Sequence, residues 1–169
     1  MSEQFYHHKK WTPKAVEAAE KLIRKIHNLA PELEVTLMGA VPLKINGRND
    51  LDIDILCPRE KLMYYKGVFE RTFGPALVDL KDTEYWAYSN DEVYWEFERD
   101  GFVADIMLHD PTTTHFRVQT KRHKKLSDNP ELLAQYKILK NRSDGLPIAE
   151  YERRKLTFFE NVVDKSEEK

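Results

Sequence analysis

Three aspartates stand in a pattern that suits divalent metal chemistry. Asp52 and Asp54 alternate with aliphatic residues in the segment 51–55, and Asp105 lies within the apolar run 103–107. Side chains two residues apart on a β-strand share a face, so the alternation places the first two carboxylates side by side. Neighbouring carboxylates repel one another, whereas Mg²⁺ or Mn²⁺ prefers such oxygen ligands. The sequence therefore predicts a metal site at Asp52, Asp54 and Asp105.

A solvated edge of a sheet is the competing interpretation of the alternating aspartates. Asp105 argues against it, because a carboxylate in a mostly buried strand needs a cation or hydrogen-bond donors. A two-residue turn at Asp100-Gly101 would set Glu96 opposite Asp105 on the neighbouring strand, and a three-residue turn would separate them. Glu96 is therefore near the site only in the first case.

Apolar spacing and turn signals predict elements that can carry these acids. Helices are expected from Thr12-Pro13 to about Ala30, over 59–73, from Asn129-Pro130 to Gly145 and from Pro147 to Val163. Strands are expected over 34–39, 51–56, 78–80, 85–88, 93–98 and 102–108. The order indicates an α+β fold, with a short mixed sheet, the first two helices on one face, and C-terminal helices over about 113–163 closing a cleft.

Two basic segments are expected to be solvated. The segment Lys121 to Lys125 is expected to form a solvated turn before the next helix. The alternative is that it contacts the phosphates of a nucleic acid or a nucleotide. His7-His8 and Lys9-Lys10 read as a flexible arm.

The composition narrows the class of protein. With 169 residues and 41% hydrophobic side chains, the chain is expected to form a single domain, 1–169, with a real core. Its net charge of -2 provides no overall basic field for nucleic acid, and no apolar run is long enough for a membrane span. The single cysteine excludes an internal disulfide, and no Cys/His set has structural-zinc spacing. We expect a soluble, cytoplasmic protein.

Several segments resemble the nucleotidyltransferase superfamily of the DNA polymerase beta type. That superfamily has a glycine-serine step after a strand, a D-x-D strand further on and a third acid on a later strand, which Gly39, Asp52, Asp54 and Asp105 match in order. The chain is also similar to the GrpB family of small nucleotidyltransferase-like proteins over roughly 34–163. This similarity lies in Ala40–Pro42, His115–Arg117, Tyr136 with Lys140, Tyr151 with Lys155, and Phe158-Phe159.

The resemblance implies a nucleotidyltransferase-like fold and a Mg²⁺-dependent transfer of a nucleoside monophosphate from an NTP, with release of pyrophosphate. In the implied two-metal scheme, one ion held by Asp52, Asp54 and Asp105 activates the acceptor hydroxyl, and the other, held by Asp52 and Asp54, binds the triphosphate. The acceptor stays open among a small molecule, a protein and RNA. The expected nucleotide-binding residues are Gly39, Ala40, Lys44, Arg48, Arg117, Lys140, Tyr151 and Lys155.

One residue departs from the superfamily pattern. The serine that follows the glycine and helps to hold the nucleotide phosphates is Ala40 in this chain. Alanine donates no side-chain hydrogen bond. A nucleotide- or phosphate-binding module of the same fold, without catalysis, is therefore the alternative function.

Overall fold

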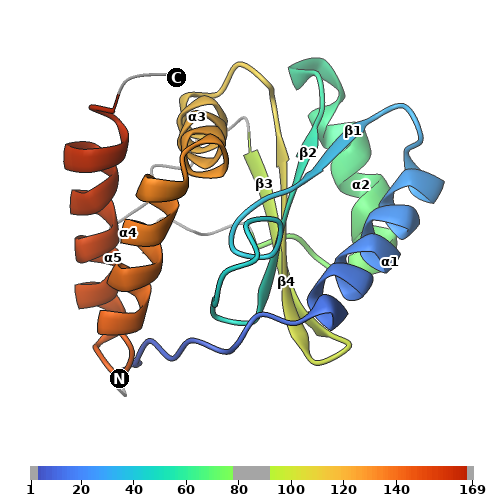
Figure 1. Cartoon of the computed structure of the whole chain (residues 1–169). Coiled ribbons are helices and arrows are strands. Elements are labelled where there is room, and N and C mark those ends of the chain that lie inside the picture. Colours follow the sequence, from blue (N-terminus) through green and yellow to red (C-terminus); the bar gives the residue numbers. More distant parts are fainter. Residues whose placement is uncertain (1–3, 78–91, 167–169) are drawn as a thin grey trace.

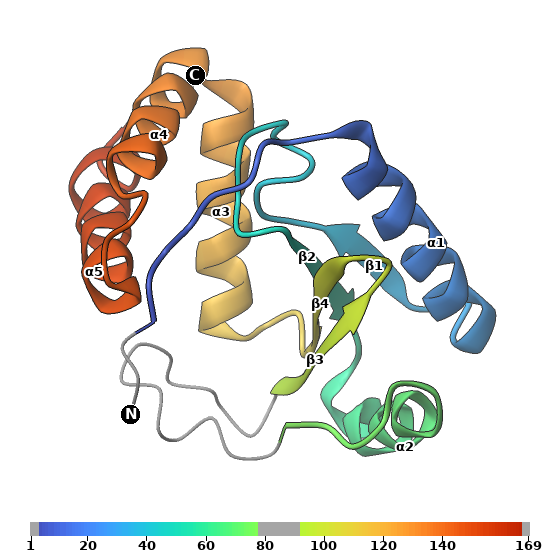
Figure 2. The ribbon, with the colours of Figure 1, turned by 90° about the horizontal axis from the view of Figure 1, so that it is seen from below.

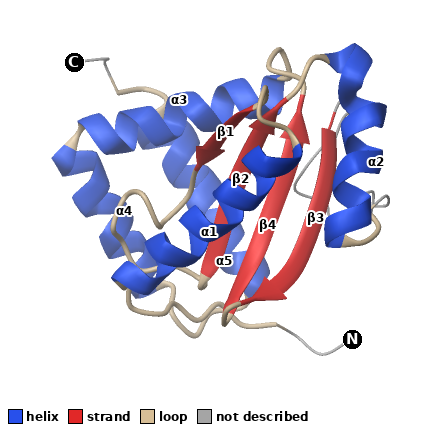
Figure 3. Ribbon diagram, turned by 90° about the vertical axis from the view of Figure 1, so that its right-hand side faces the viewer, coloured by secondary structure: helices blue, strands red, loops and turns tan. Residues whose placement is uncertain are grey.

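The computed structural model describes residues 4–77 and 92–166, and its centre is a mixed four-stranded sheet. The strands are β1 (Glu34–Leu37), β2 (Asp50–Leu56), β3 (Glu92–Arg99) and β4 (Phe102–His109), in the spatial order β1-β2-β4-β3 (Figure 3). The inner pair, β2 and β4, is parallel, and both outer pairs are antiparallel. The acids of β2 and β4 therefore lie on the two central strands.

Helices cover both faces of this sheet (Figure 1). One layer holds α1 (Pro13–Leu29) and the short η1 (Arg59–Lys61) that leads into α2 (Leu62–Phe73). The opposite layer holds α3 (Thr114–Asp128), α4 (Pro130–Arg142), α5 (Ile148–Phe158) and the π-helical turn η2 (Phe159–Val163). The expected α+β class with a short mixed sheet is confirmed.

The main core lies between the sheet and the first layer. Along β2 the odd-numbered residues Leu51, Ile53 and Ile55 are buried, and the last two pack with side chains of α1 and α2. Because strand side chains alternate, the even-numbered aspartates project from the other face, toward α3, α4 and α5. We call this second side of the sheet the polar face.

The C-terminal helices build a separate apolar cluster against the loop that follows β1. Its buried members are Ala40, Leu43, Ile45, Leu126, Leu132, Tyr136, Phe158, Phe159 and Val163. Asn129 caps α4, since its side chain accepts hydrogen bonds from the backbone N–H groups of Glu131 and Leu132. The helix starts expected at Asn129-Pro130 and Pro147 are thus observed.

The basic segment 121–125 is not a turn, as the sequence suggested, but the second half of α3. Lys125 is buried, and its ammonium group donates to the carbonyl oxygens of Val163, Asp164 and Ser166 at 2.6–3.1 Å. Arg122 forms two hydrogen bonds with the Asp164 carboxylate. These two cations therefore hold α3 against the segment 163–166.

The N-terminal arm is also ordered rather than flexible over its described part. It runs from α5 past the loop after β1 to the start of α1 (Figure 2). Tyr6 exchanges backbone hydrogen bonds with Leu146 and Gly145, and Lys9 exchanges them with Gly47. The arm thus joins the two helical layers beside the polar face.

The remaining sequence expectations fall on element boundaries or outside the described residues. The strand expected over 34–39 ends at Leu37, because Gly39 has a positive φ of 70° that breaks the extended backbone. The strands expected over 78–80 and 85–88 lie outside the described residues. Within residues 4–77 and 92–166, none of the helices has the length and apolar character needed to cross a bilayer.

Candidate functional site

Three carboxylates meet on the polar face where β2 and β4 run side by side. The parallel register pairs Asp52 with Asp105, and Asp50 lies two residues before Asp52 on the same face. One oxygen of each of these side chains lies within 4.8 Å of the others. Asp50, Asp52 and Asp105 therefore form the acidic cluster, a set of oxygen ligands of the kind that Mg²⁺ takes up.

Gly39 makes room for the central carboxylate of the acidic cluster. A Cβ atom at this position would stand 1.8 Å from Oδ2 and 2.7 Å from Cγ of Asp52. The backbone at Gly39 also has a φ of 70°, in the left-handed region that favours glycine. The glycine after β1 is thus required both by its conformation and by the carboxylate packed over it.

The acidic cluster is electrostatically unfavourable without a cation. Burial raises the pKa of Asp52 to about 8, and the charges of Asp50 and Asp105 act in the same direction. Burial also raises the pKa of Asp105 to about 6, although its hydrogen bond with Tyr94 opposes the shift. Carboxyl groups with such raised pKa values are suited to a bound cation, because the cation removes the repulsion that favours protonation.

The hairpin between β3 and β4 has the two-residue turn that the sequence left open. Asp100 and Gly101 both have positive φ values, and the resulting register sets Glu96 opposite Asp105. The hydroxyl of Tyr94 lies 2.8 Å from Asp105 Oδ1 and 3.1 Å from Glu96 Oε2. Tyr94 therefore supplies one of the donors that a partly buried Asp105 needs.

Asp54 has a different neighbour from the other expected ligands. It projects from the polar face, as predicted, but its Oδ1 lies 2.7 Å from Nε2 of His109 at the end of β4. Asp50 occupies the place in the acidic cluster that the sequence assigned to Asp54. The signal for Asp50 was present, since it continues the same alternation of acidic and aliphatic residues.

Cationic side chains approach the acidic cluster from the loop before β2 and from the C-terminal helices. Arg48 Nε lies 3.0 Å from Asp50 Oδ2. Lys140 on α4 is buried, and this burial lowers its pKa to about 8, with Lys155 acting in the same direction and the charges of Asp50 and Asp52 opposing it. Three of the expected nucleotide-binding cations therefore lie within electrostatic reach of the acids.

Tyrosine rings hold the two helical lysines in place. Lys140 Nζ lies 5.2 Å from the Tyr136 ring centroid and 6.0 Å from that of Tyr151. Lys155 Nζ lies 5.8 Å from the same Tyr151 ring. Tyr6, from the N-terminal arm, stacks on Tyr151 at 3.7 Å between centroids. The tyrosine one turn before each lysine thus contacts it as expected, and Tyr6 is a neighbour that no helical pattern indicated.

Some of the expected nucleotide-binding residues line a cavity, and others lie elsewhere. A cavity of about 220 Å³ lies between the loop after β1 and α4, with the lining residues Lys44, Ile45, Asn46, Lys137, Lys140 and Asn141. Ala40 is buried in the C-terminal apolar cluster and does not belong to this cavity lining. Arg117 is exposed on α3, a position that does not bring it into the cavity lining.

The site lies in an α+β fold. The acidic cluster is on one face of the mixed sheet, and a layer of helices covers that face. No model of a known protein family matches the sequence, and no curated protein sequence matches it. Among solved structures, the chain is similar to the crystal structure of conserved protein GrpB from Enterococcus faecalis, with a TM-score of 0.63 and 15% sequence identity. The similarity covers 90% of this chain and 97% of that chain, and it establishes a GrpB-like fold.

The raised pKa values predict an unusual dependence of stability on pH. Asp52 titrates near its ordinary value in the unfolded chain, so between about pH 4 and pH 8 the folded protein retains a proton that the unfolded chain has lost. The contribution of Asp52 to the free energy of unfolding must therefore fall as the pH rises through this window. Thermal melts in chelator at pH 5 and pH 8 test this, with Asp52→Asn as the comparison. A wild-type profile identical to that of Asp52→Asn would contradict the assignment.

Proposed function

We propose that this protein is a Mg²⁺-dependent nucleotidyltransferase that moves a nucleoside monophosphate from an NTP to an acceptor hydroxyl. The observation that carries the proposal is the acidic cluster on adjacent central strands, with buried Lys140 within electrostatic reach of it. The GrpB-like fold is compatible with the proposal, and activity itself must be argued from the site. The cytoplasmic location expected from the sequence belongs to the same proposal.

We assign different roles to the carboxylates of the polar face according to their contacts. Asp50, Asp52 and Asp105 would hold Mg²⁺ or Mn²⁺, which would polarise the reacting phosphate and stabilise the hydroxyl in its attacking form. Asp54 lies two residues further along β2, and its contact with His109 links the central strands β2 and β4 beside this site. Tyr94 keeps Asp105 oriented by its hydrogen bond, so the ligand oxygens are placed before substrate arrives.

The cations would bind the phosphates of the NTP. Lys140 lines the 220 Å³ cavity together with Lys44 and Lys137, so a ligand in this cavity would contact all three lysines. A triphosphate needs such neutralising charges on the side opposite the metal. Lys155 and Arg48 extend the positive charge toward the acidic cluster, where they already oppose the rise in the pKa of Asp52. Tyr151 positions Lys155 and Lys140 through its ring.

The experiment is a pyrophosphate-release assay with each NTP, Mg²⁺ or Mn²⁺, and panels of small-molecule, protein and RNA acceptors. We expect release with at least one combination and a loss on the order of 100-fold or more in Asp105→Asn, because the variant removes one ligand of the metal. Glu34→Gln, an exposed carboxyl group on β1, is the matched control and should behave as the wild type. Release that survives unchanged in Asp105→Asn would contradict the proposal.

A nucleotide-binding module without catalysis is the second candidate, and Ala40 is the observation that favours it. The side chain at this position packs in the apolar cluster, and a Cβ atom at Gly47 would stand 2.7 Å from the Ala40 Cβ. This close packing leaves no side-chain hydroxyl at the position of the superfamily serine, so backbone N–H groups would be the hydrogen-bond donors at that position. Saturable NTP binding that depends on Asp52, without pyrophosphate release in any combination, would favour this candidate.

A further inference from the structure

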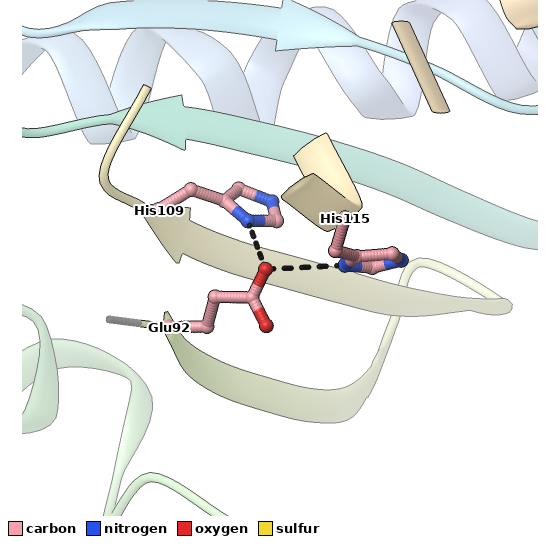
Figure 4. A group of neighbouring side chains, drawn as sticks. All are labelled: Glu92, His109 and His115. Carbon is pink, nitrogen blue, oxygen red and sulfur yellow. Dashed lines mark hydrogen bonds and ion pairs between the residues drawn. The ribbon is translucent and has the colours of Figure 1, made fainter. Parts of the chain in front are cut away.

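A second group of ligating side chains lies at the other end of the polar face. Glu92 begins β3, His109 ends β4, and His115 lies in the first turn of α3. Figure 4 shows the three side chains pointing toward one another, and one ligand atom of each lies within 4.8 Å of the others. We propose that this histidine cluster binds one divalent transition-metal ion of the zinc type through both imidazoles and the Glu92 carboxylate.

The spacing of the ligand atoms fits such an ion. Glu92 Oε1 lies 3.2 Å from Nδ1 of His109 and 3.2 Å from Nδ1 of His115. Bonds of about 2.0–2.1 Å to zinc at a tetrahedral angle separate neighbouring ligand atoms by about 3.3 Å. Each imidazole nitrogen thus already stands from the carboxylate oxygen at the separation that two ligands of one ion would have.

Asp54 fixes the orientation of the His109 imidazole. Its Oδ1 lies 2.7 Å from Nε2 of His109, which places a proton on that nitrogen and leaves Nδ1 to face Glu92. Although burial acts in the opposite direction, both ring nitrogens face carboxylates in the metal-free protein, which raises the pKa of His109, and a bound ion would displace the proton on Nδ1. In many zinc sites a carboxylate accepts a hydrogen bond from the ring nitrogen of the histidine that does not bind the metal, and so orients the ring. This role also accounts for why Asp54 lies outside the acidic cluster.

Glu92 provides the strongest reason to expect an ion. Its side chain is 1% exposed, and Oε2 has no hydrogen-bond partner among the described residues. A buried carboxylate oxygen without a donor is costly, whereas a metal ion bound by the Glu92 carboxylate would interact with both of its oxygens. The ligand set also separates the two sites chemically, since imidazole nitrogens favour zinc-type ions and the all-oxygen acidic cluster favours Mg²⁺.

The histidine cluster is partly accessible to solvent at His115. The His115 side chain is 22% exposed, whereas that of His109 is 2% exposed. Three protein ligands with one accessible side correspond to a zinc site that keeps a position for water or a small ligand, unlike a closed four-ligand structural site. The ion would also join the start of β3, the end of β4 and the start of α3.

The test uses Zn²⁺ and Co²⁺ with the full chain after removal of metals by a chelator. We expect one equivalent of Zn²⁺ to bind in excess Mg²⁺ and to raise the melting temperature by about 5–10 °C at saturation. Co²⁺ should give the visible absorption of a four-coordinate nitrogen and oxygen site. Asp52→Asn should leave both results unchanged, which separates this site from the acidic cluster and from the proposed function.

Variants locate the ion. Glu92→Gln and His115→Ala should each weaken Zn²⁺ binding at least about tenfold, and Asp54→Asn by about 10–100-fold through the orientation of His109. His7→Ala is the control, because His7 lies near Asp144 on the exposed N-terminal arm and is an alternative place for Zn²⁺. If the wild type takes up no Zn²⁺, or if His7→Ala loses binding while His115→Ala keeps it, the proposal is overturned.

Discussion

Replacing Gly39 by alanine is expected to weaken metal binding at the acidic cluster strongly. The new Cβ would stand 1.8 Å from Oδ2 of Asp52, so the carboxylate must leave its position. The positive φ of Gly39 adds a strain of about 1–2 kcal/mol, and the displaced side chain increases the loss of stability. We expect the melting temperature to fall by about 5–10 °C. Binding of Mn²⁺, followed by electron paramagnetic resonance, should weaken at least about tenfold.

Gly101→Ala separates the effect of backbone strain from the effect of the clash. Gly101 also has a positive φ, of 80°, but a Cβ there would meet no heavy atom within 4 Å. Its replacement should therefore lower the melting temperature by about 2–8 °C through strain alone and leave Mn²⁺ binding intact. Mn²⁺ affinity in Gly39→Ala equal to that of the wild type would show that the Asp52 carboxylate is not a ligand.

Replacing Asp52 by asparagine is expected to stabilise the metal-free protein and to remove the metal site. Burial and two neighbouring carboxylates make the charged form of Asp52 unfavourable, which is the cause of its raised pKa. Asparagine has nearly the same shape and no charge, so at pH 8 in chelator the melting temperature should rise by about 2–8 °C. Added Mg²⁺ should then stabilise the wild type and leave Asp52→Asn unaffected.

The opposite signs of these two effects distinguish a functional carboxylate from a structural one. A carboxylate that served only to hold the sheet would lower stability when it is replaced. Glu34→Gln should change the melting temperature by less than about 1 °C with or without Mg²⁺, because Glu34 is exposed on β1. Destabilisation of the metal-free protein by Asp52→Asn would argue against the acidic cluster as a metal site.

The sequence allowed the sheet and two of the acids to be predicted because their signals are local. Alternation of aspartate with aliphatic residues identified the polar face of β2, and the turn pair Asp100-Gly101 gave the register that sets Glu96 opposite Asp105. The position of Asp50 was missed because only the distances between the three carboxylates, which depend on the pairing of β2 with β4, select it over Asp54.

Three features could not be predicted because they depend on contacts between residues that are far apart in the sequence. The second half of α3 is rich in cations, and its buried residues, Lys125 and Leu126, give no helical apolar pattern. The N-terminal arm has no regular secondary structure, and backbone hydrogen bonds with Leu146 and Gly47 hold it. The histidine cluster draws one residue from each of three segments, so its spacing resembles no zinc motif.

The most direct test of the central claim is a calorimetric titration of the purified protein with MgATP and MgGTP. The comparison is with the double variant Asp52→Asn and Asp105→Asn, which removes two oxygen ligands that lie opposite each other in the β2–β4 register. We expect saturable binding of at least one nucleotide by the wild type and its loss in the double variant. Equal binding by both proteins, or binding by neither, would contradict a metal-dependent nucleotide site at the acidic cluster.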